Sequence, residues 1–135
     1  MQERLQWMRH APQNWLHWQP LNGGLQTHAK VQARYPDAQI FLHEDDPAKR
    51  EQAWRQLRAP WWQRWLGKDR LNPNDAPAGQ MNMLWANMAL HLYADPQSVF
   101  QQWQRALAVD GFVMFSCLGP DTLRELAEVH QAQGW

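Results

Sequence analysis

The sequence predicts an α/β fold, a parallel sheet with helices on both of its faces. Two apolar runs, Met83–Trp85 and Phe112–Phe115, are too short for helices and are typical of buried strands. Between them, Asp95 suits a helix N-cap and Pro96 suits the first helical position. Strand, helix and strand in this order form a βαβ unit, whose crossover is almost always right-handed and whose strands run parallel.

The helix between these two strands is expected to have one apolar face. Asp110 and Gly111 predict the end of this helix and a turn into the next strand. The apolar residues of the face recur at three- and four-residue spacing and are Val99, Phe100, Trp103, Ala106 and Leu107.

Two more strands are predicted earlier in the chain, at Asn14–Trp18 and Gln39–His43. The segment Lys68–Gln80 is rich in Pro, Gly and Asn and predicts a loop without a strand. The tryptophan-rich stretch Trp61–Gly67 favours packing in the core or self-association over a binding surface. Helices are expected at Gln2–Arg9, at Gly24–Arg34 with Leu25, Ala29 and Ala33 facing inward, and at Pro47–Arg58.

Composition narrows the class of protein. A chain of 135 residues predicts a single domain, residues 1–135, that is long enough for a core. Its 13 basic and 13 acidic residues give no net charge, which argues against a nucleic-acid partner. No apolar run of about 18 residues is present, so no membrane span is expected. The N-terminus lacks a signal-peptide pattern and Cys117 is the one cysteine, so we expect a cytoplasmic protein without a disulfide. The six histidines are scattered without a partner cysteine and predict no metal site.

Two stretches resemble a known family. LWANMALHLYADP and RALAVDGFVMFSCLGPDTLREL are similar to the nucleotide-binding core of class I S-adenosylmethionine-dependent methyltransferases. Within that superfamily they look most like the malonyl-[acyl-carrier-protein] O-methyltransferases of biotin synthesis, and the phrase 118–123 is the most specific part. The resemblance implies a truncated Rossmann-like methyltransferase core with strand order 2-1-4-5 in the family's naming. It covers nearly the whole chain, but only about half of a full family member, whose third strand and outer strands are expected to be absent here.

The resemblance also implies where S-adenosylmethionine would lie. In the family the first strand is followed by L-D-x-G-x-G-x-G, whose glycines let the backbone approach the cofactor. Aligned on Leu16, the acid is His17, the first two glycines are Gln19 and Leu21, and only Gly23 matches. Side chains at two glycine positions predict a filled or distorted site. Two interpretations stay open: a modified but working cofactor loop, or an ordinary turn from strand to helix.

The end of the second strand is less altered. The family places an acid there to accept hydrogen bonds from the ribose hydroxyls, and Glu44 is the matching residue. It follows Gly23 by about twenty residues, the spacing typical of such sites. An equally simple interpretation is that Asp45 or Asp46 caps the next helix.

Asn87 completes the set of cofactor-binding candidates, Gly23, Glu44 and Asn87. In the family its position lies beside the transferred methyl group. No catalytic residue is assigned: His91 would be the nearest base, but methyl transfer to a carboxylate needs none. Asp75 is the nearest acid to the missing third strand, and nothing in the sequence assigns it to adenine.

Two functions are consistent with these residues. The first is methyl transfer from S-adenosylmethionine to the carboxylate of malonyl-acyl carrier protein, with the carrier protein as partner. The second is a catalytically inactive methyltransferase-fold remnant that acts as a binding or interaction protein. Loss of the outer strands would leave open sheet edges, and zero net charge gives little repulsion, so a homo-oligomer is expected.

Overall fold

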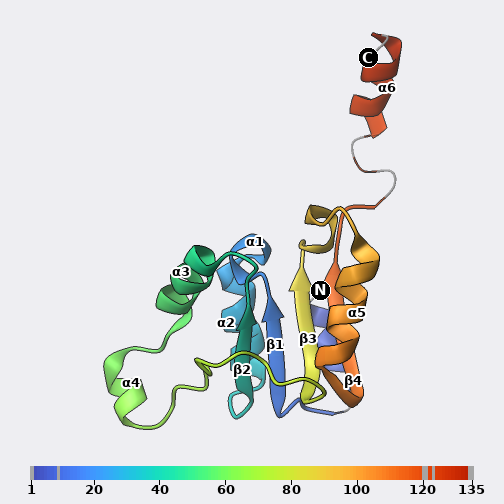
Figure 1. The fold of residues 1–135 in the computed structure, drawn as a ribbon. Coiled ribbons are helices and arrows are strands. Elements are labelled where there is room, and N and C mark those ends of the chain that lie inside the picture. The colour runs from blue at the N-terminus through green and yellow to red at the C-terminus, as the bar shows by residue number, and fades with distance from the viewer. Residues whose placement is uncertain (1, 9, 120–121, 123, 134–135) are drawn as a thin grey trace.

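The computed structural model describes residues 2–8, 10–119, 122 and 124–133 (Figure 1). Its strands are β1 (Asn14–Trp18), β2 (Gln39–His43), β3 (Met81–Asn87) and β4 (Leu107–Ser116). Its helices are the 3-10 helices η1 (Gln2–Trp7) and η2 (Leu90–Leu92) and the α-helices α1 (Pro20–Gly23), α2 (Leu25–Arg34), α3 (Pro47–Leu57), α4 (Trp61–Trp65), α5 (Pro96–Ala106) and α6 (Arg124–Ala132). Arg9, Pro120, Asp121 and Leu123, which belong to the expected first helix and to the family phrase, lie outside the described residues.

The four strands form one parallel sheet in the order β2-β1-β3-β4. This order confirms the one predicted from the sequence. β1 and β3 are neighbours in the sheet although α2, β2 and α3 lie between them in the chain (Figure 1). The chain adds β2 on one side of β1 and then β3 on the other side, so the strand order reverses between β1 and β3. In open α/β sheets, ligands bind outside the carboxyl ends of the strands at such a switch point.

Helices cover both faces of the sheet, as predicted. Successive side chains of a strand point to opposite faces, so each strand contributes to two apolar layers. On one face Trp15 and Trp85 pack with Leu5 of η1, Val31 of α2 and Ala53 of α3. On the other face the strands pack against α5, through buried residues that include Leu16, Leu84, Val99 and Trp103.

The inward face predicted for α2 is wrong at two of its three residues, while the third, Leu25, is half-buried. Ala29 and Ala33 are exposed, and the buried residues of α2 are His28 and Val31. The large Trp15 ring lies below the helix, 5.1 Å from the His28 ring. Larger side chains reach this ring and fill the layer, which alanines would leave partly empty.

The turn predicted at Asp110 is a bulge inside β4. α5 ends earlier, at Ala106, and β4 begins at Leu107. Met81 of β3 is opposite Leu107, whereas Met83 is opposite Phe112, so β4 contains extra residues at this point. Asp110 has the left-handed φ of 64°, and a Cβ on Gly111 would lie 2.7 Å from the Met81 carbonyl oxygen. Asp and Gly therefore serve a strand bulge here and not a helix end.

The prediction of a loop without any strand at 68–80 is corrected in one detail. Leu71 forms an isolated parallel bridge with Ile40 of β2. The Ile40 N–H donates to the Arg70 carbonyl at 2.9 Å, and the Asn72 N–H donates to the Ile40 carbonyl at 2.8 Å. A short remnant therefore lies on the outer side of β2, where a third strand was expected to be missing.

The tryptophans of α4 are not in the core. Trp61, Trp62 and Trp65 are 77%, 48% and 84% exposed. The prediction of core packing is therefore wrong within this chain, and self-association through α4 stays a prediction. Among the described residues no helix is both long and apolar enough to cross a membrane.

Candidate functional site

The loop after β1 is built around Gln19. Its φ of 49° and ψ of 62° lie in the left-handed region, which a glycine adopts far more readily than a glutamine. The Gln19 N–H donates to the His43 carbonyl at 2.8 Å, and the Gln19 carbonyl accepts from Asn22 and Gly23. Pro20 then starts the one-turn helix α1. The backbone thus follows a course suited to glycine, although a glutamine stands there.

The Gln19 side chain is buried and closes the ends of the neighbouring strands. Its Nε2 donates to Asp45 Oδ2 at 2.7 Å and to the Tyr93 hydroxyl at 2.5 Å, and its Oε1 accepts from Asn22 Nδ2 at 2.5 Å. The Tyr93 hydroxyl donates to Asp45 Oδ2 at 2.6 Å and accepts from Trp18 Nε1 at 3.0 Å. We call Trp18, Gln19, Asn22, Asp45 and Tyr93 the Gln19 network. It joins the ends of β1 and β2 to the segment after β3.

Ionisation reinforces the Gln19 network. Burial raises the pKa of Tyr93, and the hydrogen bond to Asp45 raises it further, so the hydroxyl stays a donor. Burial alone would raise the pKa of Asp45, but hydrogen bonds from Tyr93 and His43 outweigh burial and hold that pKa below its usual value. His43 Nε2 lies 3.1 Å from Asp45 Oδ1, and burial lowers the pKa of His43 in spite of this carboxylate. At neutral pH, Asp45 is therefore a charged acceptor for the Tyr93 hydroxyl and for the Gln19 amide.

Glu44 lies beneath the same loop. Its side chain is 4% exposed, and its Oε1 accepts from the Leu21 N–H at 3.2 Å. Burial raises the pKa of Glu44, and the Leu21 hydrogen bond opposes that shift. Asp46 caps α3, because its Oδ1 accepts from the Ala48 N–H at 2.8 Å. Of the two acids proposed as caps, the structure selects Asp46, while Asp45 belongs to the Gln19 network.

Gly23 and Asn87 are in direct contact. Asn87 Nδ2 donates to the Gly23 carbonyl at 2.5 Å, and Asn87 Oδ1 accepts from Ser116 Oγ at 2.7 Å. A Cβ on Gly23 would lie 2.7 Å from the Asn87 carbonyl oxygen, so only glycine fits. The structure therefore brings Gly23 and Asn87 together and places Glu44 at the other end of α1, under Leu21. His91 is exposed in η2.

These residues do not fit S-adenosylmethionine in the way the family pattern requires. The Gln19 side chain occupies the strand end that a glycine would leave open, and the Glu44 carboxylate is already used by the loop backbone. Beyond the network a polar cavity of about 430 Å³ remains. It is lined by Gln19, Asn22, Glu44, Asp45, Asp46, Lys49, Leu92 and Tyr93.

His17, which stands where the family has an acid, forms a buried pair with His28. The two Nδ1 atoms lie 2.9 Å apart, and the rings stack with centroids 5.2 Å apart. Burial lowers the pKa of His17 well below its usual value, helped by His28, and burial lowers the pKa of His28 to about 4. Both rings are therefore neutral, with one donating to the other. His17 Nε2 is buried without a hydrogen-bond partner in the described part of the chain.

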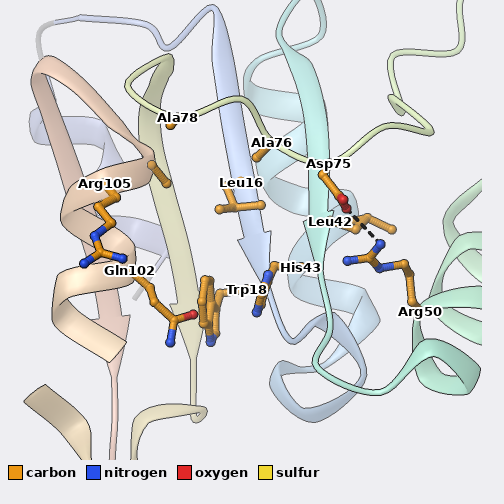
Figure 2. Close-up of a pocket in the computed structure, with 11 residues that line it drawn as sticks. Leu16, Trp18, Leu42, His43, Arg50, Asp75, Ala76, Ala78, Gln102 and Arg105 are labelled. Carbon is orange, nitrogen blue, oxygen red and sulfur yellow. Dashed lines mark ion pairs between the residues drawn. The ribbon is translucent and has the colours of Figure 1, made fainter. Parts of the chain in front are cut away.

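A second cavity, of about 330 Å³, lies over β1 and β2 on the α5 face (Figure 2). Trp18 and His43, which both line it, stack face to face with ring centroids 3.6 Å apart. Arg50 pairs with Asp75 at 2.8 Å on its rim, as Figure 2 shows. Asp75 is thus engaged by α3. Among the described residues, no group of three or more His, Cys, Asp or Glu side chains is placed so that it could hold a metal ion.

Sequence reasoning missed the residues that close the site. Tyr93 lies 74 residues after Gln19 and Asp45 lies 26 residues after it. No local pattern predicts these pairs, nor the pairing of His17 with His28 of α2. The one usable signal was a side chain in a glycine position, which indicates that something must surround it.

The fold matches solved methyltransferases. A SAM-dependent methyltransferase from Aquifex aeolicus superposes with a TM-score of 0.58 over 90% of this chain and 71% of that one, at 9% sequence identity. An arsenic(III) S-adenosylmethionine methyltransferase from Chlamydomonas reinhardtii gives 0.59 over 86% of this chain and 44% of that one, at 18% identity. The chain therefore has the Rossmann-like fold of class I methyltransferases.

Sequence comparison gives the nearer relationship, although no family model matches. The malonyl-[acyl-carrier protein] O-methyltransferase of Laribacter hongkongensis is 32% identical over 95% of this chain and 45% of its own length. That of Methylovorus sp. is 34% identical over 93% of this chain and 44% of its own length. The chain is thus related to the malonyl-[acyl-carrier protein] O-methyltransferases, and it spans about half the length of these relatives.

Proposed function

We propose that this chain is a methyltransferase-fold protein of the malonyl-[acyl-carrier protein] type whose cofactor site is closed, and that it acts as a binding or interaction protein. One observation carries the proposal: the buried Gln19 side chain is bonded across the strand ends where S-adenosylmethionine would enter. Asp45 and Tyr93 hold it there, at 2.7 Å and 2.5 Å.

Opening this site has a large energetic cost. A cofactor would have to displace the Gln19 side chain and separate it from the charged Asp45. Hydrogen bonds to charged groups contribute about 1.5–3 kcal/mol each, and neutral ones about 1 kcal/mol. A loss of about 3 kcal/mol or more moves a micromolar site beyond a Kd of ~100 μM.

Calorimetric titration with S-adenosylhomocysteine tests the proposal. We expect a Kd weaker than ~100 μM. Micromolar binding would contradict it, since the loop would then have to accept the cofactor with Gln19 in place. Sinefungin serves as a second probe, because its charged amine replaces the methyl sulfonium and checks that the missing charge of the first probe is not the reason for weak binding.

The second candidate function is methyl transfer from S-adenosylmethionine to the free carboxylate of malonyl-acyl carrier protein. It is favoured by relatives that match over 95% and 93% of this chain and by the close contact of Gly23 with Asn87. In this alternative Gly23, Glu44 and Asn87 would hold the cofactor, and the cytoplasm, where carrier proteins occur, would be the location. The assay is mass spectrometry of malonyl-acyl carrier protein after incubation with the chain and S-adenosylmethionine. A methyl ester would support this function and exclude the closed-site proposal.

A further inference from the structure

The outer edge of β4 is open in the described part of the chain. Among the described residues β4 is the last strand of the sheet, and β3 is the one strand that pairs with it (Figure 1). The other edge differs, since β2 is bridged by Leu71. Natural edge strands are usually protected by lysine, proline, a bulge or a covering segment. The Asp110 bulge protects the amino-terminal half of β4, but Phe112–Ser116 contains no charge and no proline.

Apolar surface lies on both sides of this open edge. On one side a cavity of about 690 Å³ is lined by Trp7 and Met8 together with residues 113–116 of β4. On the other side the Phe115 ring lies 6.0 Å from the Phe100 ring of α5. Trp7, Phe100 and Phe115 are 77%, 44% and 43% exposed. An unpaired strand flanked by apolar side chains on both faces has the properties of an interface and not of a solvated edge.

Charges at the two ends of the edge indicate which occupant fits. Arg4 lines the cavity beside the carboxyl-terminal half of β4. Asp110 lies near the amino-terminal end and lines a different cavity, with Val109 and Phe112. Both side chains are exposed, and neither forms an ion pair with another described residue. A two-fold axis across the edge would run the two β4 strands antiparallel and bring Asp110 of each copy to the end where the other copy has Arg4.

We propose that a second copy of this chain docks on β4, antiparallel and across a two-fold axis, to give one continuous sheet. Such an isologous contact places the same surface on both subunits, so one patch satisfies itself. It would pair the backbone groups of Phe112–Ser116 with those of the second copy and bring Trp7 against apolar side chains of that copy. By symmetry it would also place Arg4 of each copy near Asp110 of the other, at both ends of the edge. Zero net charge leaves little general repulsion between copies.

Charge reversal tests the pairing of Arg4 with Asp110. By light scattering at micromolar concentration, the wild-type chain should have a mass near twice its own 16.0 kDa. Arg4→Glu and Asp110→Lys should each weaken the dimer at least tenfold, because each places two like charges together at both ends of the edge. An equimolar mixture of the two variants should recover the dimer, since opposite charges then face each other again at both ends. Trp65→Ala, on α4 at the other side of the sheet, is the matched control and should leave the mass unchanged.

Hydrogen exchange provides a readout that does not depend on variants folding. The amides of Phe112–Ser116 should exchange more slowly when the protein concentration is raised, whereas those of β2 should not change. A wild-type monomer at these concentrations would overturn the proposal. So would a dimer that Trp65→Ala dissociates, which would place the interface at α4, or a mixture of the two charge variants that stays monomeric.

Discussion

The ends of β1 and β3 are neighbours in the sheet, yet they have changed to different degrees from the family pattern. After β1, side chains stand at two positions where glycine was expected: Gln19 fills the strand end, and Leu21 packs, partly buried, against the core of one sheet face. After β3, Asn87 still contacts the one glycine that is retained, Gly23. Gly23 is the position at which a Cβ would collide with backbone. Glycine is therefore retained where a Cβ would meet backbone, and it is replaced at position 19, although the backbone there has a left-handed φ of 49°.

The largest effect on stability is expected from lowering the pH, and it comes from the buried pair of His17 and His28 near the end of β1. Burial lowers the pKa values of His17 and His28. Between the folded and unfolded pKa values, the unfolded chain therefore binds more protons than the folded chain. The stability that this pair provides is therefore fully present above about pH 6.5. It falls as the pH drops from there toward about 4, the pKa of His28 in the folded chain. His28 alone accounts for about 3 kcal/mol over this interval. Urea unfolding at a series of pH values measures it.

His28→Leu separates this contribution from that of the carboxylates. The variant should be less stable at pH 7, since it leaves His17 without its partner, but it should lose less stability between pH 6.5 and pH 4. His91→Asn, at an exposed position, is the control and should keep the wild-type pH profile. An unchanged profile in His28→Leu would mean that the pair is solvated.

The next largest effect on stability is expected at Gly23, the glycine that is retained after β1. Gly→Ala inside a helix normally stabilises a protein, by roughly 1 kcal/mol. Gly23→Ala should have the opposite sign and cost about 2–3 kcal/mol, because the new Cβ lies 2.7 Å from the Asn87 carbonyl oxygen and only a backbone shift relieves it. Gly119→Ala is the control, since nothing lies within 4 Å of its Cβ. Chemical denaturation of both variants measures the difference, and equal stabilities would show that α1 moves freely from β3.

Elements with strong local signals were predictable. Asn14–Trp18 and Gln39–His43 are strands with the predicted bounds, because short apolar runs between turn residues leave few alternatives. The start of α5 was also predictable: Asp95 accepts from the Gln97 N–H, and Pro96 needs no partner for a missing N–H. The end of α5 was not, since Asp110 and Gly111 suit a helix end and a strand bulge equally well. Only pairing with β3 decides between them.

The site depended more on distant contacts than the fold did. The sequence indicated that Gln19 would disturb a glycine loop, but not that Asp45 and Tyr93 would hold its side chain. Such pairs are fixed by the sheet register, which places His43 beside Trp18 and so brings the following Asp45 next to Gln19. The Leu71 bridge is similar: one residue in a loop-like segment pairs with Ile40, and a single bridge has no periodicity to detect.

A third prediction concerns the space after β1, which glycines at positions 19 and 21 would restore. The double change Gln19→Gly with Leu21→Gly should strengthen binding of S-adenosylhomocysteine about tenfold, or 1.4 kcal/mol, if the rest of the site is sound. Each single change separates the two roles: Gln19→Gly should give most of the gain, because Leu21 packs toward the core. Calorimetry measures the affinities. Gains from Leu21→Gly alone would point to loop flexibility and not to the removal of the Gln19 side chain.

The smallest effect concerns Glu44, which lies between the altered and the retained parts of the loop. Its Oε1 accepts from the Leu21 N–H, and a glutamine oxygen can accept the same bond. Glu44→Gln should therefore change the free energy of unfolding by no more than about 0.5 kcal/mol. In the background with Gln19→Gly and Leu21→Gly, the same change should weaken adenosine binding a few-fold, because a charged acceptor for two hydroxyls becomes a mixed donor and acceptor. Glu51→Gln on the exposed side of α3 is the control. If Glu44→Gln leaves adenosine affinity unchanged, the carboxylate serves the loop alone, and the acid kept after β2 is structural like the glycine kept after β1.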